Sequence, residues 1–265
     1  MRKIHLLISL AIPFLGIFLS CKKQKSNDQE NGQGTDTVIV SNKILLPFKF
    51  SSEAYSLTLE YEPATSKLAK IIHSDKSYML ITYAANYYRV ERFKNNTVYH
   101  YDDFLLTEGR ATKIHSFDSF GRVDTPTGHS TLEYNASGQL VNIKEYDASK
   151  ILIMDRLMSY AVGGNLSKLT TTDKFYKTTI FDYTSDNKNG IFKHLKHARE
   201  LFLAIPYSFF CPDGNNPLSC RNALEPQQNI RYNYVYNAQN YPSQIIIDGP
   251  EGKRTFDITY AEVTN

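Results

Sequence analysis

Three side chains near residue 197 have the types and spacing of a metal site. His194, His197 and Glu200 are three residues apart, and imidazole and carboxylate groups are common zinc ligands. In a helix, a step of three residues rotates a side chain by about 60° around the axis, so these groups fan apart instead of converging. Lys193 and Lys196 lie among them. The pattern therefore favours a solvated basic helix face, and we predict no metal and no other cofactor.

Two adjacent pairs also carry reactive groups. His129 and Ser130 lack a surrounding Gly-x-Ser-x-Gly elbow, and adjacent residues of a strand point to opposite faces. Asp102 and Asp103 could serve acid–base chemistry or bind calcium, but no EF-hand spacing surrounds them. Both pairs are more typical of strand and turn surfaces. We predict no catalytic residue and expect the protein not to be an enzyme.

The N-terminal residues predict export and a lipid anchor. Arg2 and Lys3 precede an apolar run over 6–19, which is too short to span a bilayer and is typical of a signal peptide. The following Phe18-Leu19-Ser20-Cys21 resembles a lipobox, the motif at which bacterial lipoproteins are cleaved and acylated on cysteine. We therefore predict a signal peptide over 1–20 and lipidation of Cys21, which makes a membrane the first partner.

The segment after Cys21 predicts a tether. Residues 22–34 are polar and contain no aliphatic side chain, so they cannot bury enough apolar surface to offset their chain entropy. We assign a disordered tether to 21–37 and a single domain to 38–265. Without Arg2 and Lys3, 28 of the 30 basic residues remain against 27 acidic ones, a net charge of +1. This balance argues against a nucleic-acid partner.

The remaining cysteines are consistent with export. Cys211 and Cys220 bracket a turn-rich stretch, and an isolated pair in an oxidising compartment favours a disulfide. A metal pair is the weaker alternative, because no neighbouring Cys or His completes a set of four ligands.

Composition and periodicity predict β structure. The chain contains 19 Tyr and 15 Phe but no Trp. Apolar and polar residues alternate over 55–61, 178–183, 230–236 and 255–260, which places one face of each strand on a core.

A repeated seven-residue motif predicts the turns between these strands. It is read as FDSFGRV from Phe117, as YNASGQL from Tyr134, as YAVGGNL from Tyr160 and as YNAQNYP from Tyr236. Asp or Asn near its start can cap a turn through its side chain, and the later Gly or Asn tolerates the left-handed conformation that closes it. The predicted turn residues are Asp118, Gly121, Asn135, Gly138, Gly164 and Asn240.

One segment departs from the β pattern. Ile191, Leu195, Ala198, Phe202 and Ile205 have helical spacing, which predicts a helix near 190–205 before Pro206. We interpret 190–228 as an insertion that packs on the sheet or caps it.

The motifs carry a resemblance to known proteins. FDSFGRV and YNASGQL resemble the YD repeats (RHS-like) of bacterial surface proteins. With the lipid signal and the tether, the chain is similar to Bacteroidota-type lipoproteins described as a domain of unknown function with a meandering, porin-like β architecture. The resemblance covers roughly residues 45–262. It implies a fold and a location and carries over no catalytic residue.

Together these observations predict an all-β antiparallel meander of hairpin repeats, either a curved open sheet or a barrel, with one helical insertion. We expect an outer-membrane lipoprotein on the periplasmic face or the cell surface. Its expected role is non-catalytic binding or scaffolding, with an envelope protein or a glycan left open as the partner. The alternative is an envelope hydrolase or a glycan-processing accessory with a site between sheet and insertion.

Overall fold

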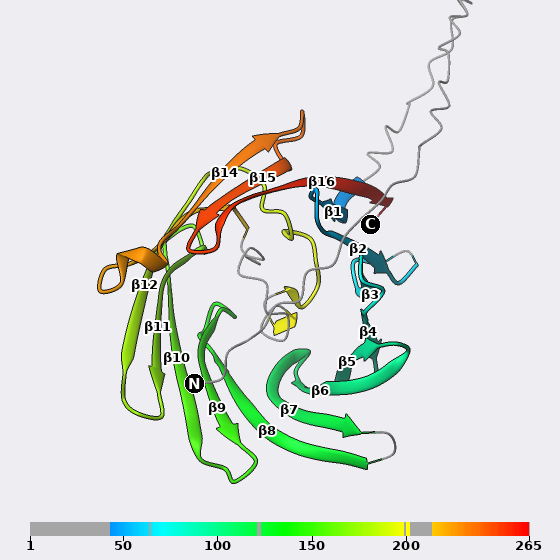
Figure 1. Cartoon of the computed structure of the whole chain (residues 1–265), viewed down its shortest axis with the longest axis vertical. Coiled ribbons are helices and arrows are strands. Elements are labelled where there is room, and N and C mark those ends of the chain that lie inside the picture. The colour runs from blue at the N-terminus through cyan, green and yellow to red at the C-terminus, as the bar shows by residue number, and fades with distance from the viewer. Residues whose placement is uncertain (1–42, 64, 121–122, 199, 202–213, 265) are drawn as a thin grey trace, which may run out of the picture.

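The computed structural model describes residues 43–63, 65–120, 123–198, 200–201 and 214–264, and its strands form one closed antiparallel barrel (Figure 1). Each strand pairs with its neighbours in sequence, and the last pairs with the first. The elements are β1 (Lys43–Ser51), β2 (Ser56–Tyr61), β3 (Leu68–His73), β4 (Tyr78–Tyr83), β5 (Tyr87–Lys94), β6 (Thr97–Thr107), β7 (Arg110–Phe120), β8 (Val123–Tyr134), β9 (Leu140–Asp147), β10 (Leu152–Tyr160), β11 (Leu166–Asp173), β12 (Thr178–Ser185), β13 (Pro217–Asn222), η1 (Pro226–Gln228), β14 (Ile230–Tyr236), β15 (Pro242–Gly249) and β16 (Gly252–Thr264).

The antiparallel meander predicted from the sequence is confirmed, and the choice left open between a sheet and a barrel resolves to a barrel. β1 pairs with β16 from Lys43 opposite Thr264 to Ser51 opposite Asp257. This pairing removes both sheet edges, which would otherwise expose unpaired backbone groups.

Alternation along the strands creates a mostly apolar inner face and an outer face that mixes polar and apolar side chains. In β16, Phe256 and Ile258 are buried, whereas the alternate Thr255, Asp257 and Thr259 are exposed. The same period of two is seen in other strands of the barrel. Charged outward positions within strands include Arg89, Lys168, Asp182 and Asp257, and exposed apolar ones include Leu157, Ile180 and Val235.

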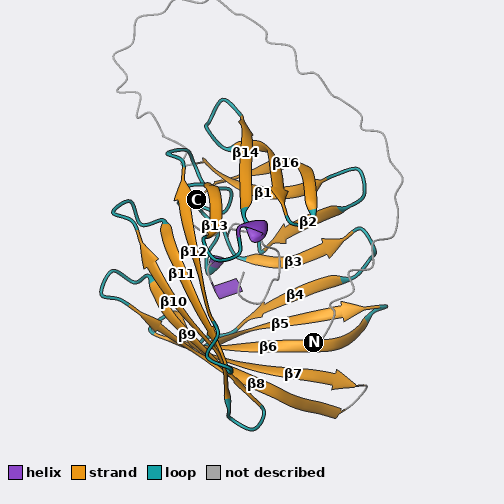
Figure 2. Ribbon diagram, turned by 60° about the vertical axis from the view of Figure 1, so that its left-hand side comes forward, coloured by secondary structure: helices purple, strands orange, loops and turns teal. Residues whose placement is uncertain are grey.

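The two ends of the barrel are distinct. One end carries the start of β1, the end of β16 and the turns over 62–67, 84–86, 135–139, 161–165 and 237–241. We call it the plug end, because the connection between β12 and β13 begins and ends there. The opposite end, which we call the cavity end, carries the turns over 52–55, 95–96, 148–151 and 174–177. Long hairpins of β6 to β10 extend toward it (Figure 2).

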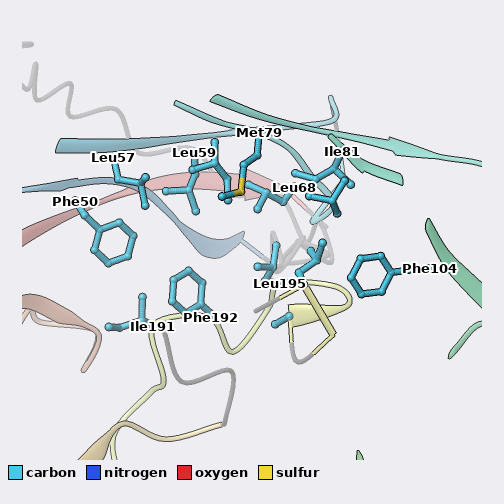
Figure 3. Close-up of a cluster of buried hydrophobic side chains, with 14 of the residues drawn as sticks. Phe50, Leu57, Leu59, Leu68, Met79, Ile81, Phe104, Ile191, Phe192 and Leu195 are labelled. Carbon is cyan, nitrogen blue, oxygen red and sulfur yellow. The ribbon is translucent and has the colours of Figure 1, made fainter. Parts of the chain in front are cut away.

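The described residues of the connection between β12 and β13 lie inside the barrel (Figure 1). We call these residues, 186–198, 200–201 and 214–216, the internal segment. Figure 3 shows Ile191, Phe192 and Leu195 pointing toward side chains of the surrounding strands. Phe192 is 1% exposed, and its ring stacks on that of Phe50 in β1. The internal segment therefore contributes to the core from within the lumen.

Two predictions about this region need correction. The predicted helix near 190–205 is not shown over its first half, because residues 191–197 lie in turns, and only 198, 200 and 201 are helical among the described residues of this range. His197 has φ 58, a left-handed conformation that a continuous α-helix does not tolerate. The insertion is also shorter than the predicted 190–228, since β13 belongs to the barrel. It lies within the barrel and does not cap a sheet.

The signal peptide predicted over 1–20 and the tether over 21–37 lie outside the described residues, as does lipidated Cys21. Within the described part of the chain, no helix has the length and apolar character needed to cross a membrane.

Candidate functional site

A polar cavity of about 350 Å³ opens on the inner face of β5 to β10, toward the cavity end. Its volume falls within the range of small-molecule sites, roughly 300–1,000 Å³. Every lining residue belongs to a barrel strand, and none comes from the internal segment. The charged lining residues are Arg92, His100, Asp102, Glu145 and Arg156, and the apolar ones include Phe104, Ile114, Ile143 and Ile153.

Asp102 is the most buried charged group of the cavity, at 5% exposure. It lies opposite Val90 in β5 and Ser116 in β7, which places its side chain on the inner face. Arg92 Nη2 lies 2.9 Å from Asp102 Oδ2, and the Ser116 hydroxyl donates to Oδ1 at 2.6 Å. Burial raises the pKa of Asp102, but His100, Arg92 and Ser116 together outweigh it and lower that pKa below its ordinary value. The carboxylate is therefore held ionised.

His100 joins two carboxylates. Its Nδ1 lies 2.8 Å from Asp118 Oδ1 and its Nε2 lies 3.3 Å from Asp102 Oδ1. An imidazolium satisfies this arrangement by donating through both nitrogens. Burial lowers the pKa of His100, yet the hydrogen bonds to Asp102 and Asp118 outweigh burial and raise the pKa overall.

A second ion pair lies across the cavity from the first. Arg156 Nη2 in β10 is 2.9 Å from Glu145 Oε1 in β9. The side chains are 30% and 26% exposed, so solvent reaches them. The two arginines of the lining, Arg92 and Arg156, balance its two carboxylates, Asp102 and Glu145, and the charge of a protonated His100 is balanced by Asp118, which lies beside the lining. The cavity wall thus carries separate charges but no net charge.

The internal segment is fixed at the plug end by polar contacts. The Tyr134 hydroxyl in β8 lies 2.9 Å from Glu200 Oε1 and 2.8 Å from the carbonyl oxygen of Ala111, two acceptors that share its single proton. His194 Nε2 lies 2.8 Å from the Tyr241 hydroxyl. These bonds and the apolar packing hold the segment in one position inside the lumen.

The three side chains considered as metal ligands go to different partners. His194 contacts Tyr241, Glu200 contacts Tyr134, and the His197 ring lies 5.2 Å from that of Tyr88. Among the described residues, no group of three or more His, Cys, Asp or Glu side chains could hold a metal ion. The sequence predicts that the side chains of His194, His197 and Glu200 diverge around a helix. In the structure they diverge because residues 191–197 lie in turns.

The two adjacent pairs split between the faces of the barrel. Ser130 pairs with Glu145 on the inner face, whereas the His129 side chain belongs to the opposite face and its ring stacks at 4.7 Å on that of Tyr146, although both of these ring-bearing residues also contribute to the cavity lining. Asp102 points inward, and Asp103 points outward to Arg89, with Nε and Oδ1 2.6 Å apart. Asp102 was expected on a solvated strand or turn surface, and that interpretation is wrong because it is 5% exposed and its side chain points to the inner face of β6.

The predicted turn residues fall into two groups. Gly138, Gly164 and Asn240 have φ of 75°, 81° and 62° in turns of the plug end. Asn135 Oδ1 accepts the backbone N–H groups of Ser137 at 3.0 Å and Gln139 at 2.9 Å. These contacts are those of a side-chain-capped turn.

Asp118 does not occupy the turn position predicted for it. It pairs with His100 on one side and with Thr125 on the other, within β7. The hairpin therefore turns three residues later than the motif suggests, after Phe120, which pairs with Val123. Gly121 lies outside the described residues.

The predicted disulfide stays a prediction. Cys220 is a buried free thiol of β13, and Cys211 lies outside the described residues. Burial raises the pKa of Cys220, and a hydrogen bond with Tyr183 only partly offsets that effect.

Of the charged residues of the cavity, sequence reasoning singled out Asp102 alone. Arg92, His100, Glu145 and Arg156 each occupy an inward position of a strand whose other inward residues are mostly apolar. A charged residue at a strand position that otherwise alternates as apolar and inward could have indicated the cavity. To use this signal, one must know which residues of each strand point inward.

Comparisons with known proteins show the fold. No protein-family model matches the chain, and no curated protein does. The solved structures that are similar to it include two porin-like proteins. A porin-like protein from Bacteroides uniformis superposes with a TM-score of 0.57 at 14% identity, covering 83% of this chain and 96% of that one. A porin-like protein from Bacteroides vulgatus gives a TM-score of 0.53 at 14% identity, covering 82% and 99%. At this identity the likeness concerns architecture alone, and it confirms the expected porin-like β architecture.

Proposed function

We propose that the protein is a lipid-anchored, non-catalytic binding protein of the cell envelope, with its ligand site in the barrel lumen. One arrangement carries the proposal: the internal segment occupies the lumen from the plug end, and a polar cavity remains toward the cavity end. We infer that the cavity is a blind pocket, closed toward the plug end. Such a pocket suits a binding protein, because a ligand enters and leaves it by one route.

The outer face supports an anchored barrel in preference to a membrane-spanning one. A transmembrane barrel carries an apolar outer band and a polar interior. This barrel has the reverse arrangement, with Glu60, Lys168 and Asp257 outside and a cluster of buried apolar side chains inside. A lysine such as Lys168 would cost about 2–4 kcal/mol at the bilayer midplane, and an acidic residue would cost less. Attachment through Cys21 requires no such burial.

The chain termini give the anchored barrel an orientation. β1 begins and β16 ends at the plug end, so a tether over 21–37 approaches the barrel from that side. With Cys21 acylated, the plug end would face the membrane. The cavity would then open away from the bilayer, where a ligand has access to it.

The geometry gives less support to the alternative of an envelope hydrolase with a site between sheet and insertion. The cavity is lined by strands and contains no residue of the internal segment. The Ser116 hydroxyl donates to Asp102 and has no neighbouring histidine nitrogen at hydrogen-bond distance among the described residues. Both nitrogens of His100 are directed at carboxylates, so neither serves as a base.

Two measurements test the proposal. In the native host, the wild-type chain should fractionate with membranes and Cys21→Ala should not. Reconstituted into planar bilayers, the wild-type protein should produce no ion conductance. Membrane association that survives Cys21→Ala would overturn the anchor, and reproducible single-channel currents would overturn the blind pocket.

A further inference from the structure

The cavity wall offers paired charges that are already neutralised, and this determines what it can recognise. Asp102 is held by Arg92, and Glu145 is held by Arg156, each pair at 2.9 Å. An anionic ligand would have to displace one of these carboxylates, and a cationic ligand would have to displace an arginine. Either exchange would leave a charged side chain without its partner in a partly desolvated site, which is costly.

A neutral ligand rich in hydroxyl groups meets no such penalty. A hydroxyl both donates and accepts hydrogen bonds, whereas a guanidinium only donates and a carboxylate only accepts. An ion pair therefore presents a donor beside an acceptor, which matches two neighbouring hydroxyls of one ligand. Ser130 adds a further hydroxyl to the same wall.

The cavity also provides an apolar surface next to these polar groups. Ile153 lines it and is partly exposed, whereas Phe104 and Ile143 lie behind the surface at 0% and 2% exposure. The C–H face of a sugar ring is apolar while its rim carries hydroxyls. A wall that combines the accessible edge of an aliphatic side chain with two ion pairs is complementary to both parts of such a ring.

We infer that the cavity formed by Arg92, Asp102, Glu145 and Arg156 binds a neutral polyhydroxylated small molecule, of the class of mono- and disaccharides. The inference rests on the proposed binding function and adds its ligand class. The volume of about 350 Å³ limits the ligand to one or two rings.

The test uses the full chain purified in detergent and three matched probes: glucose, glucuronate and glucosamine. Their rings are alike, but their charges at neutral pH are zero, negative and positive. Saturation-transfer NMR with competition should show that the wild-type protein prefers the neutral probe. Preference for either charged probe, or no binding of glucose or its disaccharide maltose by folded protein, would overturn the inference.

Two charge variants make the test specific to this wall. Glu145→Gln leaves Arg156 without its partner carboxylate and should shift the preference toward glucuronate by about tenfold, the change expected for one hydrogen bond to a charged group. Arg156→Gln should shift it toward glucosamine. Lys144→Ala is the control, because Lys144 occupies an outward position of the same strand. Unchanged preferences in both charge variants would show that the sugars bind elsewhere and refute the assignment.

This outcome is separable from the test of the proposed function. Preference for a charged probe would replace the ligand class and leave the anchored binding protein intact. Ion conductance would remove the blind pocket whatever the sugar preference.

Discussion

The ring of Phe192, from the internal segment, stacks on the ring of Phe50 in β1, with centroids 5.8 Å apart and planes inclined by 23°. Both side chains are about 1% exposed. The contact joins residues far apart in the chain and attaches the internal segment to the barrel wall. The lumen therefore contains core packing, and the internal segment is part of what stabilises the fold.

Phe192→Ala should destabilise the barrel by about 3–5 kcal/mol, the range for truncating a buried phenylalanine. The substitution removes the contact with Phe50 and leaves a cavity between the internal segment and the barrel wall. Urea unfolding followed by circular dichroism measures the change. Phe175→Ala is the matched control, because Phe175 is 78% exposed and should cost less than about 0.5 kcal/mol. Equal stabilities of the two variants would contradict a structural role for the internal segment.

The buried Glu200 carboxylate depends on Tyr134 at the plug end. Burial and the neighbouring Glu200 both raise the pKa of Tyr134, so the phenol stays protonated and donates. Tyr134→Phe should destabilise the protein by about 1–3 kcal/mol, because a carboxylate that is 7% exposed loses a hydrogen bond.

A double-mutant cycle isolates this contact. In the background of Glu200→Gln, Tyr134→Phe should cost less than in the wild type, because the acceptor no longer carries a charge. Unfolding free energies of the four proteins give the coupling. Strictly additive effects would show that the bond contributes nothing specific.

His100 should make stability depend on pH. The pKa of His100 is raised in the folded protein, so its contribution is fully present below the unfolded value of about 6.5 and is lost as pH rises through the folded pKa. The difference in unfolding free energy between the wild type and His100→Gln should therefore be largest in mildly acidic buffer and should shrink at alkaline pH. A difference that grows with pH would have the wrong sign.

The control for this effect removes one of the two carboxylates. Asp118→Asn takes away the partner 2.8 Å from Nδ1 and should lower the pKa of His100 relative to the wild type, as measured by NMR titration. His129, on the outer face, should titrate unchanged in the same spectra.

The strands could be predicted from the sequence, whereas the closure of the sheet into a barrel could not. Alternation over 55–61, 178–183, 230–236 and 255–260 depends on neighbouring residues, and all four segments contain strands of the barrel. The pairing of β1 with β16 joins residues such as Lys43 and Glu262, 219 positions apart. Nothing local encodes such a contact, because it is selected by the tilt and twist of the whole sheet.

The internal segment illustrates a second limit. The spacing of Ile191, Leu195 and Ala198 correctly marked side chains that become buried. Periodicity identifies which side chains need a core, and it cannot determine whether a helix or a series of turns brings them there. Asp118 shows the same limit. Its motif predicts a turn, but its side chain points inward to His100 and the residue lies within β7.

Gly128 permits a close approach of β8 to β9 beside the cavity. A Cβ atom at this position would lie 2.1 Å from the carbonyl oxygen of Tyr146, a backbone atom that cannot move aside without disturbing the strand pair. Gly128→Ala should therefore destabilise the barrel by about 1–3 kcal/mol through steric strain.

The matched control is Gly214→Ala, since a Cβ atom there meets nothing within 4 Å. It should leave the free energy of unfolding nearly unchanged. Urea unfolding measures both variants, and the intensity of His100 and Ser130 resonances reports whether the damage stays next to the cavity. If Gly128→Ala were as stable as Gly214→Ala, the strands β8 and β9 would have to separate further than the structure shows. The wall that carries Glu145 would then be less rigid than ligand selection by charge balance requires.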